Sequence, residues 1–182
     1  MSQRVIRRAA NQSRVAVADL LEALMIAELV APPSRLLLVS PWISDFPLID
    51  NRAGRFAHLD SQWSATRIRL SAVLRSFLIR GTHVYIACRP ARREDEFVEH
   101  LQTVAELDGT DSFLTFQRAE DRFRDRSHEK ALVADSWALH GSMNFTYSGV
   151  ELNGELVTFT DDESLVAELA GELLPLFGSL SA

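Results

Sequence analysis

Polar side chains recur at two-residue spacing in one otherwise apolar stretch of the chain, HEKALVADSWALHGSMN. In an extended strand, residues i and i+2 point to the same side, so His128 and Lys130 are expected to share one face. The same argument places Ser142 and Asn144 together on the following segment. Gly141, directly before them, allows the backbone to approach a ligand closely. We therefore expect two polar pairs to converge from adjoining strands.

These residue types are suited to phosphoryl chemistry. A neutral imidazole, here His128, is a competent nucleophile toward phosphorus. Lys130 and Asn144, assisted by Ser142, can bind the non-bridging oxygens, where negative charge accumulates in the transition state. Because these donors take over the electrostatic role of a metal ion, we expect neither a metal nor another cofactor. Taken singly, His128 would be a structural histidine and Lys130 a solvated lysine, and it is the spacing of the set that favours a site.

The set resembles the signature of the phospholipase D superfamily, which reads His-x-Lys, four residues, Asp, a short spacer and Gly-Ser-x-Asn. The matching positions are His128, Lys130, Asp135, Gly141, Ser142 and Asn144. By its position, Glu155 resembles the carboxylate that orients the catalytic imidazole in that family. We interpret Asp135 as a structural turn or salt-bridge residue. The resemblance implies attack by one histidine, a phosphohistidine intermediate, and a second histidine that protonates the leaving oxygen and later activates water.

That scheme needs two histidines, whereas the chain contains one such motif. The remaining histidines, each followed two residues later by something other than lysine, are His58, His83, His100 and His140. The resemblance to single-motif members of the family therefore implies a homodimer with a shared, two-fold related site, and two-fold pairing is the commonest oligomer symmetry. We interpret His140 as structural.

Further candidates for substrate binding lie earlier in the chain. Trp42 could line the entrance of the site, although a tryptophan that follows a buried strand is more often part of the core. Arg52, Arg55 and His58 could contact substrate phosphates, and an exposed polar loop is an equally good interpretation of them. They belong to residues 43–65, which show no clean period and many turn formers, so we expect a long loop or lid there.

The apolar pattern predicts an α/β fold in which a mixed β-sheet is sandwiched between helices, as in one phospholipase D-like half-domain. We expect a single domain over residues 1–182, with an N-terminal helical region over 1–34. Helices are expected over 15–31, 65–81, 93–107 and 163–177. Strands are expected over 35–42, 83–88, 112–117, 128–135, 136–142 and 155–161.

Composition narrows the class of protein. The formal net charge of -6 argues against a uniformly basic binder of nucleic acid, although nearly all basic residues are arginines and several of these are clustered, at 4–8, 89–93 and 118–126. The lone cysteine, Cys88, is expected to be a buried small hydrophobe. The most apolar run, LLEALMIAELVA, is too short to span a bilayer, so we expect no membrane association and a cytoplasmic location.

The motif predicts a reaction class and leaves the substrate open. We favour a metal-independent nuclease that cleaves DNA. The alternatives are a catalytically silent subunit that binds nucleic acid or serves as a scaffold, and a phospholipase. The segment VSPWISDFPLIDNRAGRF resembles small phospholipase D-like proteins of bacterial phage-defence and DNA-modification gene clusters, which would add partner proteins of a defence complex. DNA against RNA, strand preference, and cleavage at ends or at interior bonds stay open.

Overall fold

A seven-stranded mixed sheet forms the centre of the protein, with strand order β1-β9-β8-β7-β2-β5-β6. The computed structural model describes residues 3–7, 16–118 and 130–178. Strands β2, β5 and β6 run parallel, and β7, β8, β9 and β1 continue the sheet in antiparallel pairs. The strands are β1 (Gln3–Arg7), β2 (Arg35–Val39), β5 (His83–Cys88), β6 (Leu114–Arg118), β7 (Ala131–Val133), β8 (Ala138–Gly141) and β9 (Leu156–Thr160).

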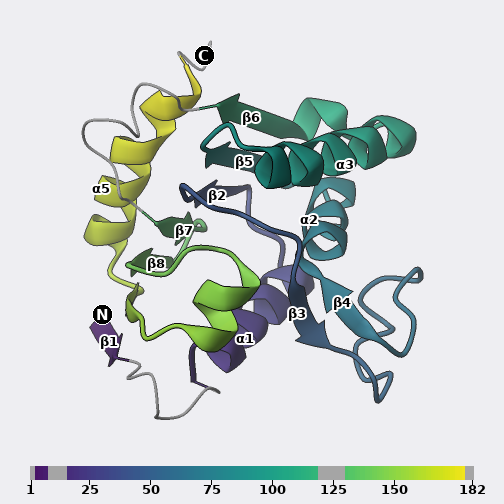
Figure 1. Ribbon diagram of the computed structural model, residues 1–182, viewed down its shortest axis with the longest axis horizontal. Helices are drawn as coiled ribbons and strands as arrows, with labels where there is room; N and C mark the ends of the chain where they lie inside the picture. The colour runs from purple at the N-terminus through teal and green to yellow at the C-terminus, as the bar shows by residue number, and fades with distance from the viewer. Residues whose placement is uncertain (1–2, 8–15, 119–129, 179–182) are drawn as a thin grey trace.

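Helices cover both faces of this sheet, which confirms the predicted α/β sandwich (Figure 1). On one face lie α1 (Ala16–Val30), α2 (Leu70–Ile79) and α3 (Arg92–Asp108), and on the other lie α5 (Glu163–Leu173) and the short helix η3 (Leu174–Phe177). Strand β2 shows why: Leu36 and Leu38 pack into the larger core beneath α1 to α3, whereas Leu37 and Val39 pack beneath α5. A central strand of such a sheet is buried on both faces and is therefore apolar throughout.

The expected long loop or lid over 43–65 is corrected by the structure. Its first part contains strand β3 (Pro47–Asp50), which pairs with β4 (Arg67–Arg69) in a separate two-stranded sheet. The segment is anchored to the body because its apolar residues are buried, namely Ile43, Phe46, Leu48, Ile49, Leu59 and Trp63. Turn formers hid this strand from the sequence pattern. The helix expected from residue 65 begins only at Leu70, because residues 67–69 form β4.

The N-terminal region differs from its prediction as well. The helix expected over 15–31 is confirmed as α1, but residues 3–7 form strand β1, which pairs with β9 at the edge of the sheet. Five residues with one partner strand carry too weak a pattern to be recognised without that partner. At the other end of the chain, the last predicted helix is shorter than expected, because α5 ends at Leu173 and η3 contains Pro175.

Cys88 is fully buried at the end of β5, as predicted. Burial raises the pKa of its thiol to about 12, with smaller contributions from the carboxylates of Glu94 and Asp95. The thiolate is therefore not populated at neutral pH, and a reactive cysteine is not part of the chemistry. Within residues 3–7, 16–118 and 130–178, no helix has both the length and the apolar character needed to cross a bilayer.

Candidate functional site

The predicted site residues lie along one edge of the main sheet. The antiparallel pairs β2–β7, β7–β8 and β8–β9 bring the ends of β2 and β8 beside the starts of β7 and β9. The register aligns Val39 with Ala131, Ala131 with His140, and Gly141 with Val157. Residues just beyond these positions therefore meet at the same edge, and they are Ser40, Lys130, Ser142, Asn144 and Glu155. His128, the predicted nucleophile, lies outside the described residues, two positions before Lys130.

Gly141 allows the strands at this edge to approach closely. Its φ is +150°, and a Cβ built at this position would lie 2.1 Å from the carbonyl oxygen of Leu156. The Gly141 amide donates to the carbonyl of Lys130 at 3.1 Å, and the Ser142 amide donates to Leu156 at 2.9 Å. Gly141 was expected to let the backbone approach a ligand closely. The structure shows that it approaches the backbone of β9 instead, and the two hydrogen bonds join the end of β8 to the starts of β7 and β9.

Ser142 and Glu155 are bonded to each other. The Ser142 hydroxyl donates to Oε2 of Glu155 at 2.5 Å and accepts from the Leu156 amide at 3.0 Å. Glu155 is only 9% exposed although it carries a carboxylate, so it needs donors where it lies. A carboxylate accepts through two oxygens, and this bond to one of them leaves capacity for a further donor such as an imidazole N–H.

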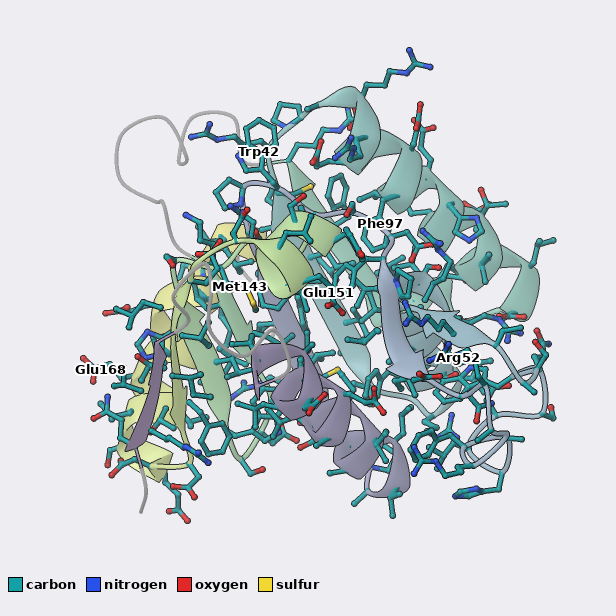
Figure 2. The ribbon with its side chains drawn as sticks, turned by 60° about the horizontal axis from the view of Figure 1, so that its bottom comes forward. Trp42, Arg52, Phe97, Met143, Glu151 and Glu168 are labelled. Atoms are coloured by element: carbon teal, nitrogen blue, oxygen red, sulfur yellow. The ribbon has the colours of Figure 1, made fainter. Side chains whose placement is uncertain are left out.

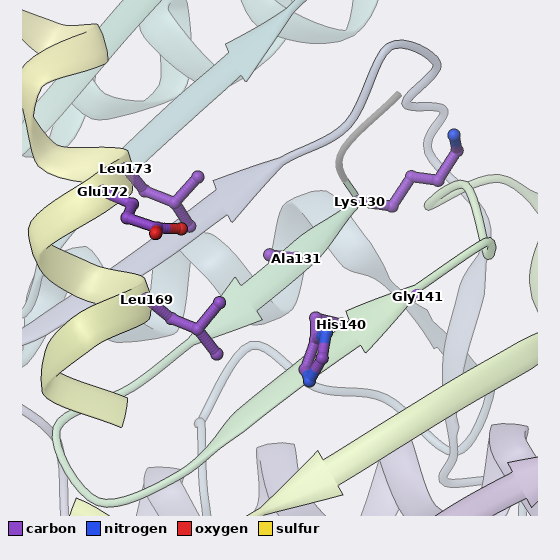
Figure 3. Close-up of a pocket in the computed structure, with 7 residues that line it drawn as sticks. All are labelled: Lys130, Ala131, His140, Gly141, Leu169, Glu172 and Leu173. Carbon is purple, nitrogen blue, oxygen red and sulfur yellow. The ribbon is translucent and has the colours of Figure 1, made fainter. Parts of the chain in front are cut away.

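Lys130 is half-buried at the start of β7. Burial lowers the pKa of its ammonium group, the negative charge of Glu155 opposes this shift, and the positive charge of Arg89 adds to it. The charges of Glu155 and Arg89 therefore both act on Lys130. In Figure 3 the Lys130 side chain extends away from the side chains of α5 that line the neighbouring pocket.

Arg89 also lies at this edge, although the sequence pattern indicated it only as part of the arginine cluster at 89–93. It directly follows β5, whose end lies at the same edge as the end of β2 because these two strands are parallel. Two other arginines of the clusters noted in the sequence are held in ion pairs: Arg92 with Glu96 on α3, and Arg118 with Asp95. Its position immediately after a buried apolar strand could have predicted that Arg89 lies at this edge.

Asn144 is held by Ser40, a second residue that the sequence analysis did not single out. Ser40 is fully buried, and its hydroxyl lies 3.3 Å from Oδ1 of Asn144 and 2.9 Å from the carbonyl oxygen of Trp42. The same hydroxyl accepts from the Phe145 amide at 3.4 Å. Because the amide oxygen of Asn144 faces Ser40, its NH₂ group is the part available to bind a ligand oxygen.

The residues predicted to bind substrate divide into two groups. Trp42 is 43% exposed and therefore not a core residue, and the guanidinium of Arg89 lies 5.7 Å from the centre of its ring. Arg52 instead pairs with Asp50 at 2.6 Å, and Figure 2 shows it well apart from Trp42. Arg55 lies over the ring of Phe56, on the side of the molecule where that ring borders α1. The structure thus brings Trp42 to the site edge and does not bring Arg52 or Arg55 there.

Asp135 lies at the opposite end of β7 from Lys130. It accepts hydrogen bonds from the amide and hydroxyl of Ser34, at 2.5 and 2.9 Å, and lies 3.8 Å from Arg35. These contacts agree with the structural role expected for Asp135. His140 lines a pocket of about 410 Å³ between α5 and strands β7 and β8, together with Lys130 and Glu172 (Figure 3).

The sheet edge carries two cations, an amide and a hydroxyl, and the hydroxyl is bonded to a buried carboxylate. Such donors can hold the non-bridging oxygens of a phosphate ester, and the carboxylate can orient and stabilise an imidazolium beside it. Among the residues that the structure describes, no three side chains of His, Cys, Asp or Glu gather in a way that could hold a metal ion.

A sequence profile of the family described as "Cardiolipin synthase, PLD-like domain" matches residues 62–176, which include every motif position from His128 to Glu155. No curated protein matches the chain by sequence.

Solved structures of similar fold include two bacterial proteins of comparable length. Nuc, a phospholipase D family member from Salmonella typhimurium, aligns with a TM-score of 0.57 and 11% identity over 96% of this chain and 93% of that one. NucT from Helicobacter pylori aligns with a TM-score of 0.56 and 13% identity over 98% and 96% of the two chains. TrmBL2, an archaeal chromatin protein, aligns at 0.52 and 12% identity over 98% of this chain and 54% of that one. At these identities the likeness establishes the fold alone.

Proposed function

Because this chain belongs to the phospholipase D superfamily, we propose that it is a metal-independent phosphodiesterase, and specifically a nuclease that cleaves DNA. The observation that carries the proposal is the meeting of Lys130, Asn144 and the Ser142–Glu155 pair at one sheet edge. These residues stand in the order and spacing of the superfamily signature, and Lys130 is the only lysine of the chain. A lone lysine at a half-buried position beside a carboxylate is more consistent with a binding role than with solubility.

In the proposed reaction, a ring nitrogen of His128 attacks the phosphorus atom. A nitrogen–phosphorus bond forms, the bond from phosphorus to the leaving oxygen breaks, and that oxygen takes a proton from a second imidazole. Lys130 and the NH₂ group of Asn144 bind the non-bridging oxygens as their charge grows. Glu155 accepts the other N–H of His128, which fixes the tautomer and stabilises the positive charge on the ring. Water activated by the second imidazole then releases the phosphate from His128.

The second imidazole is proposed to be His128 of the partner subunit. None of the other four histidines is followed by a lysine two residues later. His140, which is nearest to His128 in sequence, lines the pocket between α5 and strands β7 and β8. A two-fold axis at the site edge would place two copies of the set around one phosphate. The complete reaction then requires a homodimer.

The first experiment tests the reaction and its independence from metal. We expect purified protein to cleave DNA in excess EDTA, and His128→Ala to abolish cleavage. His100→Ala is the matched control, because His100 is an exposed histidine on α3, and it should cleave like the wild type. Loss of cleavage in EDTA, or full activity of His128→Ala, would contradict the proposal.

The second experiment tests the shared site. Wild-type and His128→Ala subunits are co-refolded at varied ratios, so that mixed dimers form statistically. If both imidazoles of a dimer are needed, activity falls with the square of the wild-type fraction. A linear decrease would mean that each chain is active alone.

A second candidate function is supported by the fold of TrmBL2, an archaeal chromatin protein described with a novel mode of DNA binding. In this alternative the chain binds nucleic acid, or serves as a scaffold for partner proteins of a phage-defence complex, and cleaves nothing unaided. It predicts DNA binding that is unchanged in His128→Ala, together with no cleavage by the purified protein. Robust cleavage by the protein alone eliminates it.

A lipid substrate is the third candidate, because the matching family is described by a cardiolipin synthase. It requires turnover of phospholipid vesicles at a rate at least comparable to cleavage of DNA. Vesicles of phosphatidylglycerol and of phosphatidylcholine, assayed beside DNA, decide between these substrates.

A further inference from the structure

Trp42, which is exposed, and Arg89, which is half-buried, form a pair at the edge that carries the site. The guanidinium of Arg89 lies 5.7 Å from the centre of the Trp42 ring, and 43% of the surface of Trp42 is exposed. Both residues follow the ends of neighbouring parallel strands, Trp42 after β2 and Arg89 after β5. An exposed indole beside an arginine at a site for phosphate esters requires a reason, because large apolar surfaces are normally buried.

The backbone holds this pair firmly. The ladder between β2 and β5 continues beyond both strands, since the Ser40 amide donates to Ala87 at 3.0 Å and the Arg89 amide donates to Pro41 at 3.3 Å. Trp42 and Arg89 are therefore carried by paired backbone, which fixes the position of the ring and of the first atoms of the arginine side chain.

The pair is also connected to both ends of the proposed phosphate-binding set. The buried hydroxyl of Ser40 contacts the carbonyl of Trp42 and the amide oxygen of Asn144, so one side chain sets the positions of both. Just beyond Trp42, Ile43 bridges Phe145, and the Ser44 amide donates to the same residue. On the other side, the charge of Arg89 acts on Lys130. The indole thus borders the place where the phosphate is proposed to bind.

We propose that Trp42 and Arg89 form a subsite for an unpaired nucleobase next to the scissile phosphate, so that the substrate is single-stranded nucleic acid. This inference rests on the proposed nuclease function. The base stacks on the face of the Trp42 ring that Arg89 does not cover, and Arg89 binds the adjacent backbone phosphate. In a duplex each base is already stacked between its neighbours and is not available to the ring.

The charges on the pair favour a nucleobase over a lipid headgroup. An indole can also attract the quaternary ammonium group of a choline lipid. Here, however, Arg89 lies over the ring and Lys130 lies nearby, and two positive charges repel a choline group. A neutral aromatic base joined to a negative phosphate matches both the ring and the cations.

The experiment measures binding in excess EDTA with His128→Ala protein, so that the result does not depend on cleavage. The probes are labelled oligonucleotides of one length: single-stranded DNA, single-stranded RNA of the same sequence, duplex DNA, and a single strand whose nucleotides lack bases. We expect single strands with bases to bind at least about tenfold more tightly than the duplex or the abasic strand. The two single-stranded probes with bases show whether DNA or RNA is preferred.

Substitutions then assign the effect to the pair. Trp42→Ala should weaken binding of single strands by about 10-fold to 100-fold and leave binding of the abasic strand unchanged, while Trp42→Phe should retain part of the preference. Arg89→Ala should weaken binding of all probes. Arg92→Ala is its matched control, because Arg92 is an arginine on α3 paired with Glu96, and it should bind like the parent protein.

Two outcomes would overturn the subsite: equal binding of abasic and normal strands, or Trp42→Ala binding single-stranded DNA as tightly as the parent protein. Thermal unfolding of each variant checks that a loss does not come from misfolding. If wild-type protein cleaves nothing but binding shows the expected preference, the proposed hydrolysis fails and the subsite stands. If normal single strands, abasic strands and duplex are all cleaved equally, the subsite fails and the proposed hydrolysis stands.

Discussion

The hydroxyl of Ser142 donates a 2.5 Å hydrogen bond to the buried carboxylate of Glu155, and it accepts a second bond from the amide that follows Glu155 in the chain. The signature serine is thus bonded to the residue proposed to orient the imidazole. We therefore expect Ser142 to position Glu155, in addition to its proposed contact with substrate, and we expect the energetic contributions of the two residues to depend on each other.

Replacement of Glu155 by glutamine should separate charge from shape. Glu155→Gln retains an acceptor for Ser142 but removes the negative charge that stabilises a protonated imidazole. We expect kcat on DNA to fall by about 10²-fold to 10⁴-fold, in the range typical of lost acid–base assistance. Steady-state kinetics measure the effect. A change of about 1 kcal/mol in stability would move Tm by only about 2–4 °C in a domain of this size, so a modest shift in Tm is compatible with this interpretation.

Ser142→Ala provides the comparison for that variant. If Ser142 acts by positioning Glu155, the double variant Ser142→Ala, Glu155→Gln should be little slower than Glu155→Gln alone. Fully additive effects of the two substitutions would show that the serine acts independently of the carboxylate.

Removal of the Ser40 hydroxyl should loosen the Asn144 amide. In Ser40→Ala a fully buried hydroxyl is lost, and the partly buried carbonyl oxygens of Trp42 and Asn144 lose a donor, which should lower the free energy of unfolding by about 1–3 kcal/mol. Catalysis should decrease as well, because the NH₂ group of Asn144 is no longer held in one orientation. Urea unfolding and kcat/KM on DNA measure the two effects.

Ser76→Ala is the matched control for Ser40→Ala. Ser76 is equally buried, and its hydroxyl donates to Asp60 and to the carbonyl of Ala72, at a helix away from the site. It should cost a similar amount of stability and leave kcat/KM unchanged under folding conditions. Equal catalytic losses in the two variants would mean that Ser40 affects only stability.

Lys130 should lose its proton at a lower pH than an ordinary lysine. Burial disfavours the charged ammonium and Arg89 adds repulsion, so the pKa falls below its usual 10.5, against the smaller opposing effect of Glu155. Because Lys130 is the only lysine, NMR of the reductively methylated protein should show a single lysine signal, and its midpoint should lie below that of the same methylated lysine in urea-unfolded protein.

The same shift should appear in the activity. A catalyst that needs the Lys130 charge loses activity as pH rises through the lowered pKa, so the alkaline limb should begin below the range of a solvated lysine. Lys130→Arg keeps its charge at high pH and should move that limb upward, even if its maximal rate is lower. An unchanged limb in Lys130→Arg would show that another group titrates there.

Alanine substitutions at two glycines should have opposite effects on stability. At Gly141 a Cβ would lie 2.1 Å from the Leu156 carbonyl at a φ of +150°, so Gly141→Ala forces β8 and β9 apart. We expect at least about 2 kcal/mol of destabilisation, in the range of the larger effects of single substitutions, and loss of activity. Gly171→Ala, on α5 with open space around it, should stabilise the protein by up to about 1 kcal/mol. Thermal and urea unfolding measure both, and tolerance of alanine at position 141 would contradict the structure at this edge.

Elements that carry strong local patterns could be predicted from the sequence alone. Continuous apolar runs such as RLLLV and HVYIAC predicted buried strands, and helical spacing predicted α1 and α3, because burial of apolar surface dominates those segments. The spacing of Lys130, Ser142, Asn144 and Glu155 predicted a common site, and their order along adjoining antiparallel strands brings them to one edge. Weakly patterned strands were not recognised: β1, β3 and β4 are short, and each is defined by its pairing with a strand distant in the sequence.

Which other residues lie at that edge depends on long-range contacts of the folded chain. Arg52 and Arg55 carry the same guanidinium as Arg89, but their loop packs beside α1 and their side chains turn to Asp50 and Phe56. Arg89 and Ser40 reach the site because the parallel pairing of β2 and β5 aligns the ends of strands more than 40 residues apart in sequence. Local propensity cannot express this pairing, since a strand's partner and register depend on long-range contacts. The chemical character of each side chain can therefore be predicted from the sequence, whereas its neighbours in space depend on the pairing of the strands in the completed sheet.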